Sequence, residues 1–263
     1  MNDTPWLGYT KKWDALKPPM RPTPAVISIM QRESTPGPVL MLGVTPEIHA
    51  AFDDIVAIDR DKSMIAAIWP GDTPTKCAIR RSWTDLDWDR GEFASIVSDC
   101  GVNMLGDLSA IAEFQASCAK WLVPGGSMVH RVMSRPDTDV TLAEIRLDLE
   151  STAEINFHAF RWKLGQHVAS QNHSKVAHQQ VWELFNDICS DRDRLSSITG
   201  WTRADIDCID LYKDSVVTVV FPTIAEWTNT VPSAAVDTRY LTTDDYDLSE
   251  HCPIMAWNTD ING

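Results

Sequence analysis

Positive charge and long apolar runs are both scarce in this sequence of 263 residues. It contains 23 Lys and Arg against 37 Asp and Glu, which gives a formal net charge of -14. A surface of that sign repels nucleic-acid phosphates and anionic lipid headgroups, so we expect neither as a partner. No apolar run is long enough to span a bilayer, and residues 1–10 lack the apolar stretch of a signal peptide. We therefore expect a cytoplasmic protein that acts on a small molecule, with a homodimer left open.

Metal, redox and dinucleotide motifs are missing too. The six cysteines form no C-x-x-C pair, which argues against a zinc ribbon or a dithiol centre. Four of the seven histidines lie between residues 158 and 178, but no H-E-x-x-H motif is present, so we expect no metal. The fingerprint G-x-G-x-x-G is also absent, which disfavours a nicotinamide cofactor.

Short apolar runs alternate with helical segments between residues 38 and 133. The runs expected to form strands are 39–44, 55–58, 76–80, 93–97 and 127–132. Helices are expected after Thr45, a suitable N-cap followed by Pro46, and over 61–68 and 108–121. This alternation predicts an α/β fold, doubly wound and Rossmann-like, with a mostly parallel sheet and helices on both faces. Ligands of such sheets bind at the carboxyl ends of the strands.

Four motifs in this region resemble, in order and spacing, those of class I S-adenosylmethionine (SAM) dependent methyltransferases. They are VLMLGVTPE (Val39–Glu47), IVAIDRDKSM (Ile55–Met64), FASIVSDCGVN (Phe93–Asn103) and WLVPGG (Trp121–Gly126). The resemblance covers a little over a third of the chain. It implies a seven-stranded sheet with a reversed last strand, SAM as cofactor and methyl transfer as the activity.

The resemblance also assigns the residues that bind SAM. They are Gly43, Val44, Thr45, Asp59, Met64, Ser82, Trp83, Asp99, Cys100 and Asn103. A glycine at the end of the first strand lets the backbone approach the methionine part of SAM, and the acid that ends the second strand accepts hydrogen bonds from the ribose. The sequence departs from the family at two points: the glycine-rich loop keeps only Gly43, and Met41 replaces the acid that often holds the SAM amino group.

The remaining segments are assigned around this core. Residues 1–37 are expected to form a lid with helices near 9–16 and 25–32, and residues 136–203 a helical insert that contacts the substrate. A hairpin over 206–212 and 215–221 is expected to supply the reversed last strand. The SAM-binding core is therefore 38–135 with 204–222, and 223–263 is a tail within a single domain.

Methyl transfer mainly requires alignment of nucleophile, methyl group and sulfur, because the cofactor carries the reactive group. Aromatic side chains suit the sulfonium, and Trp6, Tyr9, Trp13 and Trp162 are candidates for the pocket wall. The candidate catalytic residues are His130, His158 and Tyr9, with Asp99 as a further base. Strand alternation allows only one of His130 and Arg131 to face the crevice.

Two other functions stay open at this point. The aromatic N-terminal segment and the insert weakly resemble azetidine-2-carboxylate synthases, which cyclise SAM to azetidine-2-carboxylate and methylthioadenosine. Loss of the acid at position 41 fits a reaction that needs a free amine. The reduced glycine loop instead fits a non-catalytic SAM-fold partner protein, although Asp59 and Asp99 argue against that function.

Overall fold

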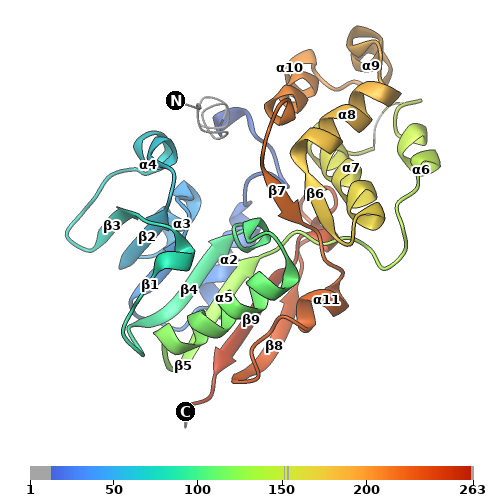
Figure 1. Ribbon diagram of the computed structural model, residues 1–263. Helices are drawn as coiled ribbons and strands as arrows, with labels where there is room; N and C mark the ends of the chain where they lie inside the picture. Colours follow the sequence, from blue (N-terminus) through green and yellow to red (C-terminus); the bar gives the residue numbers. More distant parts are fainter. Residues whose placement is uncertain (1–12, 151, 153, 262–263) are drawn as a thin grey trace.

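A single seven-stranded sheet forms the centre of the computed structural model, which describes residues 13–150, 152 and 154–261. Its strand order is β3-β2-β1-β4-β5-β9-β8. The strands are β1 (Val39–Leu42), β2 (Ile55–Asp59), β3 (Lys76–Arg80), β4 (Phe93–Asp99), β5 (Leu122–Arg131), β8 (Ala235–Leu241) and β9 (Ile254–Thr259). The first five are parallel, and β9 runs antiparallel to both β5 and β8 (Figure 1). The predicted mostly parallel sheet with a reversed strand is confirmed.

Alternate residues of the central strands point to opposite faces, and both faces are covered by helices. Leu40 and Leu42 of β1 pack in the core under α5 (Leu108–Trp121) and α11 (Ile224–Thr228). Val39 and Met41 pack in the core on the other face, under α2 (Pro24–Glu33) and α3 (Pro46–Ala51). Helix α4 (Lys62–Ile68) covers β2 and β3. Because both faces are buried, the strands appear in the sequence as continuous apolar runs.

The strand register brings polar residues to one edge of the sheet. Leu42 pairs with Ile58 on one side and with Ser98 on the other, so Gly43, Asp59 and Asp99 follow at the same level. Asp99 in turn pairs with Arg131, the last residue of β5. The carboxyl ends of four parallel strands therefore meet along a line of polar groups.

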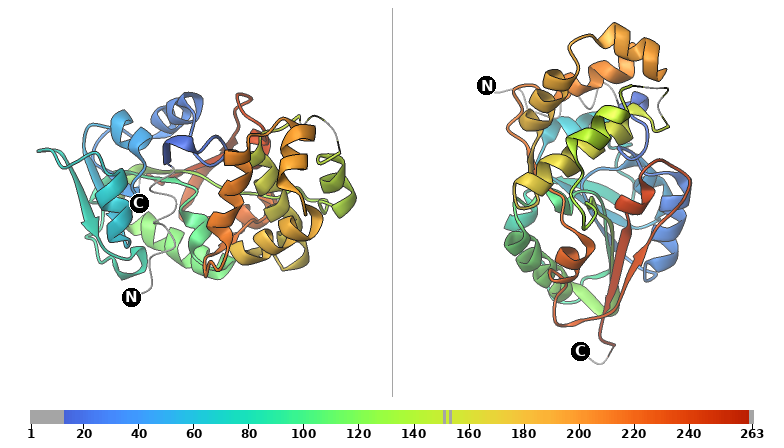
Figure 2. Two further views of the ribbon diagram at one scale, coloured as in Figure 1. Left: turned by 90° about the horizontal axis from the view of Figure 1, so that it is seen from above. Right: turned by 90° about the vertical axis from the view of Figure 1, so that its right-hand side faces the viewer.

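A helical insert follows β5 and lies beyond this edge, in yellow and orange in Figures 1 and 2. Its elements are α6 (Leu142–Leu147), α7 (Phe157–Gln171), β6 (Lys175–Ala177), α8 (His178–Ile188), α9 (Arg192–Thr199), α10 (Arg203–Ile206), η4 (Asp207–Tyr212) and β7 (Thr218–Val220). It has its own apolar core, in which α7 is buried on nearly all sides. The helical insert before the last sheet strands is thus confirmed.

The predicted hairpin over 206–221 is wrong. Residues 203–212 are helical, and β7 pairs with β6 in a separate two-stranded sheet. Ile206, Ile209 and Tyr212 are buried at a spacing of three residues, which suits a helical turn. The reversed strand is β9, with β8 beside it at the sheet edge. Residues 204–222 therefore belong to the insert, and the predicted tail supplies two strands of the sheet.

Only part of the N-terminal segment covers the carboxyl ends of the strands, as a lid would. After η1 (Trp13–Ala15), α2 packs on the sheet face against β5 and β9 rather than over the strand ends. Residues from Trp13 to Met20 do reach the strand ends. Of the expected helix near 9–16, residues 9–12 lie outside the described residues, and the described half contains only the 3-10 turn η1. No helix in the described part of the chain is long and apolar enough to cross a membrane.

Candidate functional site

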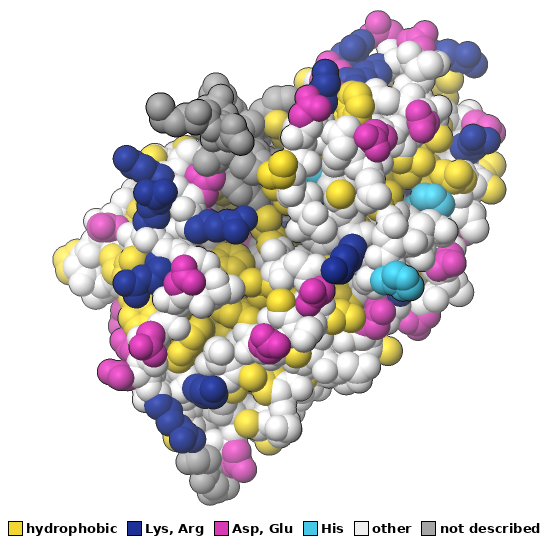
Figure 3. Space-filling view, viewed as in Figure 1, with side chains coloured by type: hydrophobic (Ala, Val, Ile, Leu, Met, Phe, Trp, Pro, Cys, Tyr) yellow, Lys and Arg dark blue, Asp and Glu magenta, His cyan; other side chains and the backbone are white. Residues whose placement is uncertain are grey.

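A cavity of about 450 Å³ lies between the carboxyl ends of the strands and the insert. The loops after β1, β2, β3 and β4 form one wall, and α7, α8 and η4 form the opposite wall. Apolar side chains gather at the surface between these two parts of the molecule (Figure 3). The volume of the cavity is in the range of cavities that hold small ligands.

The turn after β1 forms part of the cavity wall on the side of the sheet. Gly43 has a φ of 96°, which favours glycine, and its N–H donates to the Ile58 carbonyl at 2.8 Å. Thr45 precedes α3 and is buried, but its side chain makes no capping hydrogen bond to that helix. Gly43, Val44 and Thr45 all line the cavity. Backbone and hydroxyl groups of this turn are therefore placed to contact a ligand.

Asp59 ends β2 and lines the cavity. Its Oδ1 accepts the Asp61 N–H at 2.8 Å, while Asp61 caps α4 by accepting from the backbone N–H of Ser63 and Met64. Burial raises the pKa of Asp59 to about 6, and the Asp61 N–H and the charge of Arg60 oppose that rise. Helix α4 is therefore capped by Asp61 and not by Asp59. Asp59 stays at the cavity although burial there disfavours its charged form.

Trp83 stands beside Gly101 on the same wall. Its indole N–H donates to the Ile58 carbonyl at 2.7 Å, which fixes the ring at the end of β2. A Cβ on Gly101 would lie 2.7 Å from Trp83 Cη2 and 2.7 Å from Ser98 Oγ. Gly101 is therefore required for the ring to reach its position, and Trp83 presents an aromatic surface to the cavity.

Asp99 and Arg131 form a buried ion pair at the centre of the strand edge. Arg131 Nε lies 2.6 Å from Asp99 Oδ1, and the two side chains are 1% and 6% exposed. Arg131 also donates to the Pro19 carbonyl at 2.9 Å. Of the pair His130 and Arg131, Arg131 is the residue that lines the cavity. Cys100 lines it as well, but burial raises the pKa of its thiol well above the usual value, so the thiol is protonated.

The structure brings nine of the ten predicted SAM-binding residues to the cavity wall, the exception being Asn103. Its amide donates to the carbonyls of Met133 and Val220, and its Oδ1 accepts the Met133 N–H. Asn103 therefore connects the end of β5 to β7, and its predicted contact with the cofactor is corrected to a structural role.

Two of the predicted catalytic residues lie away from the cavity. His130 is fully buried, has no hydrogen-bond partner among the described residues, and faces Trp227 edge-on at 6.0 Å. His158 is buried with Nε2 3.9 Å from Asp205 Oδ1. Desolvation lowers the pKa of each to about 3. The prediction that they serve as bases in the crevice is therefore wrong, and Tyr9, like Trp6, lies outside the described residues.

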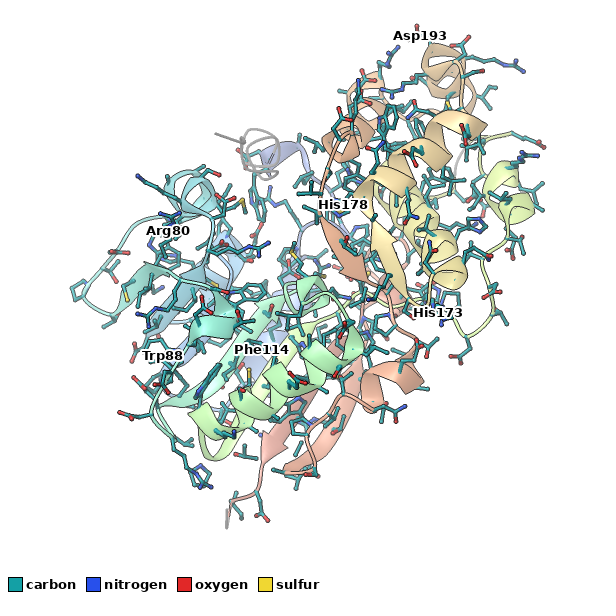
Figure 4. The ribbon with its side chains drawn as sticks, viewed as in Figure 1. Arg80, Trp88, Phe114, His173, His178 and Asp193 are labelled. Carbon is teal, nitrogen blue, oxygen red and sulfur yellow. The ribbon has the colours of Figure 1, made fainter. Side chains whose placement is uncertain are left out.

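The insert supplies the opposite wall of the cavity, and most residues of that wall were not predicted from the sequence. Arg161, Trp162, His178 and Tyr212 line the cavity; only Trp162 was predicted. In Figure 4, His178 lies on the side of the insert nearest the strand ends, whereas His173 lies at its lower end. His178 is one of the four histidines between residues 158 and 178, and no sequence motif distinguishes it from the other three. Tyr212 was assigned to a strand, which hid its position on the helical wall.

Metal binding finds no support in the described part of the chain, where no group of three or more His, Cys, Asp or Glu could hold an ion. All six cysteines are free.

No protein-family model matches the chain, and no curated protein matches it by sequence. Solved structures do match its fold. A SAM-dependent methyltransferase from Methanosarcina mazei is 10% identical with a TM-score of 0.52, over 92% of this chain and 99% of that one. The chain has the class I SAM-dependent methyltransferase fold.

Other solved structures that match the chain are not described as methyltransferases. A candidate Zn-dependent alcohol dehydrogenase from Rhodobacter sphaeroides is 12% identical with a TM-score of 0.61, over 97% of both chains. A candidate exported protein from Bordetella parapertussis is 15% identical with a TM-score of 0.50, and this chain spans 66% of its length. At such identities the likeness concerns the fold, and the function has to be argued from the cavity.

Proposed function

We propose that the protein binds SAM in this cavity and transfers its methyl group to a small molecule. The observation that carries the proposal is Asp59, a carboxylate kept at the cavity although burial raises its pKa to about 6. The hydrogen bond from the Asp61 N–H offsets only part of that desolvation, whereas hydrogen bonds from the two hydroxyls of a ribose would compensate it further.

The rest of the sheet-side wall fits the other parts of SAM. Trp83 and Gly101 provide a flat surface with no Cβ beside it, which suits the adenine ring. The Gly43–Thr45 turn offers backbone groups and a hydroxyl without a capping role to the methionine part. Both acids on the described cavity wall, Asp59 and Asp99, lie on this side. Arg131 is paired with Asp99, so Asp59 is the acid of this wall that is proposed to meet the ligand.

Bound SAM would supply a methyl group that is activated by its sulfonium. The chain would align the acceptor and exclude water, since the wall formed by Trp162, Phe221 and neighbouring residues is largely apolar. Burial lowers the pKa of His178 on this wall to about 3, so it is a weak base. Positioning of the acceptor, rather than strong base catalysis, is therefore the proposed contribution of the insert.

A small acceptor agrees with the size of the cavity, which cofactor and acceptor would share, and with the net charge of -14. We further propose that the protein acts in the cytoplasm, since its six free cysteines suit a reducing compartment. No observation in the described residues favours SAM cyclisation over methylation.

The test is mass spectrometry of the protein incubated with SAM that carries a trideuterated methyl group. One sample contains SAM alone, and the other also contains a pooled small-molecule extract. We expect SAM to persist in the first, and S-adenosylhomocysteine with a deuterium-labelled product to form in the second. The Asp59→Asn variant is the matched control and should give neither product. Methylthioadenosine in the sample without extract would instead show a cyclase and overturn the methylation proposal.

A further inference from the structure

Gly165 lies in the middle of helix α7 and lines the cavity. Glycine weakens the interior of a helix relative to alanine, so a buried glycine at such a position calls for a physical reason. The reason is the ring of Phe221, which follows β7 and also lines the cavity. A Cβ on Gly165 would come within 2.9 Å of Phe221 Cε2 and 3.2 Å of its Cζ. Glycine at this position therefore lets the ring lie directly on the helix.

Trp162 stands about one turn before Gly165 on the same face of α7. Its ring lies 5.4 Å from the ring of Phe221, at an interplanar angle of 37°. The two side chains are 4% and 5% exposed, and both line the cavity. Trp162 and Phe221 therefore form one aromatic surface, and Gly165 determines how close this aromatic surface lies to the helix.

The polar side chains of the insert wall are engaged with one another in a stack. The rings of His178 and Tyr212 lie 3.9 Å apart, and the guanidinium carbon of Arg161 lies 4.8 Å from the centre of the Tyr212 ring. Arg161 also donates to the Cys208 carbonyl at 3.1 Å. Desolvation and the charge of Arg161 lower the pKa of His178 to about 3, so its imidazole is neutral at physiological pH.

This arrangement favours an uncharged ligand at the insert wall. The insert contributes no acid to the cavity lining among the described residues, and its arginine there, Arg161, is already bonded. A charged ligand group at this wall would lose its hydration without gaining a partner of its own. The aromatic surface instead offers apolar contact to a flat ring.

A methyl group at Gly165 would displace the Phe221 ring away from α7. The core of the insert around the ring is closely packed, whereas the cavity beside it is open, so we expect the ring to move into the cavity. The cavity would then become shallower at the aromatic surface. A wide ligand would lose more contact there than a narrow one.

We propose that the aromatic surface binds the methyl acceptor as a flat, uncharged aromatic molecule, and that Gly165 is a positioning residue that sets the size of the accepted ring system through Phe221. This inference rests on the proposed function, because it names the acceptor class for the same cavity. A flat ring system buries apolar area against two aromatic side chains and gains the offset ring contact that such groups prefer. A saturated ring system of the same size gains the burial alone.

The experiment compares 2-naphthol with phenol, which has one ring fewer, and with decahydro-2-naphthol, which has the same carbon skeleton but is not flat. Each compound is titrated by calorimetry into the protein in saturating S-adenosylhomocysteine. We expect 2-naphthol to bind about fivefold more tightly than decahydro-2-naphthol, because ring contacts add to burial. Equal affinities of these two compounds, or no binding of 2-naphthol, would overturn the inference.

Gly165→Ala tests the size limit. It should weaken the binding of 2-naphthol by about tenfold and that of phenol by less than about twofold, because the wider ring system reaches the displaced Phe221 ring. Ser170→Ala changes the same helix at a position that does not line the cavity, and should leave both affinities unchanged. A merely structural role of Gly165 would lower both affinities equally, and that result would contradict its assignment as a positioning residue.

Phe221→Leu is a second variant that does not depend on the folding of Gly165→Ala. It removes the ring and should reduce the preference for 2-naphthol over decahydro-2-naphthol to less than about twofold; a preference that survives would contradict the aromatic surface as the binding site. Binding of S-adenosylhomocysteine is measured first. Its absence from the unaltered protein contradicts the proposed function, whereas its presence without a preference for 2-naphthol contradicts this inference alone.

Discussion

Arg131 Nε lies 2.6 Å from Asp99 Oδ1, and this buried pair connects four parts of the chain at the cavity. Asp99 ends β4 and Arg131 ends β5, while the guanidinium also donates to the Pro19 carbonyl and lies 3.3 Å from the Tyr246 hydroxyl. The N-terminal segment and the segment between β8 and β9 are thereby held to the strand ends. The pair shapes the site and contributes to the stability of the fold.

Breaking this pair on one side should destabilise the protein strongly. Arg131→Met leaves the Asp99 carboxylate buried without its cation, and we expect a loss of about 3–5 kcal/mol in the free energy of unfolding. Adding Asp99→Asn removes the unpaired charge and should recover part of that loss. Urea denaturation of both variants is the measurement. A double variant no more stable than Arg131→Met would show that the loss arises elsewhere.

Asp59→Asn should separate stability from function. The variant keeps an oxygen for the Asp61 N–H but removes a carboxylate whose pKa burial raises. Because the folded-state pKa of about 6 exceeds the ordinary value of 3.8, ionisation of Asp59 costs stability as pH rises through that interval. At pH 7 we therefore expect a higher melting temperature without ligand, together with SAM binding weakened by at least about tenfold. A less stable variant that binds SAM normally would contradict the role assigned to Asp59.

Gly101→Ala should weaken SAM binding by displacing Trp83. The backbone at Gly101 has a φ of -68°, so the added methyl is opposed by contact with Trp83 and Ser98 rather than by backbone strain. We expect a loss of about tenfold in SAM affinity. Gly200→Ala is the control, since that residue ends α9 with a φ of 79° and a methyl group added there would meet no atom within 4 Å. It should lower stability by about 1 kcal/mol and leave SAM affinity unchanged.

His130 should make the fold sensitive to acid. Its pKa falls from 6.5 to about 3 on folding, so the unfolded chain binds more protons and stability is lost as pH falls below 6.5. Between pH 7 and pH 5 this amounts to on the order of 2 kcal/mol. His130→Leu should reduce the difference in unfolding free energy between these pH values by about that amount. His173→Asn, which replaces an exposed histidine, is the control; an equal effect of both substitutions would rule out burial as the cause.

The parallel half of the fold could be predicted because its information is local. Strands β1, β2, β4 and β5 contain short apolar runs, and the residues that end these strands lie at the same sheet edge. That rule alone placed Gly43, Asp59 and Asp99 on one wall. It could not decide between His130 and Arg131, because the alternation of a strand does not reveal which of its faces meets a ligand.

The reversed strands and the insert wall depend on contacts between distant residues. Strand β9 pairs with β5 more than a hundred residues earlier in the chain, and β8 is a partly exposed edge strand without a continuous apolar run. The run at 215–221 looked like a sheet strand but pairs within the insert. Likewise, the stack of Arg161, Tyr212 and His178 joins three elements whose sequences give no sign that they meet.

The most direct test of the account is a calorimetric titration of the purified protein with SAM, followed by NAD⁺ as the competing dinucleotide. We expect one SAM to bind per chain and NAD⁺ neither to bind nor to displace it, since Asp59 and Trp83 face the cavity without a G-x-G-x-x-G loop. Absence of heat with SAM, or displacement of SAM by NAD⁺, would contradict the assignment of this cavity.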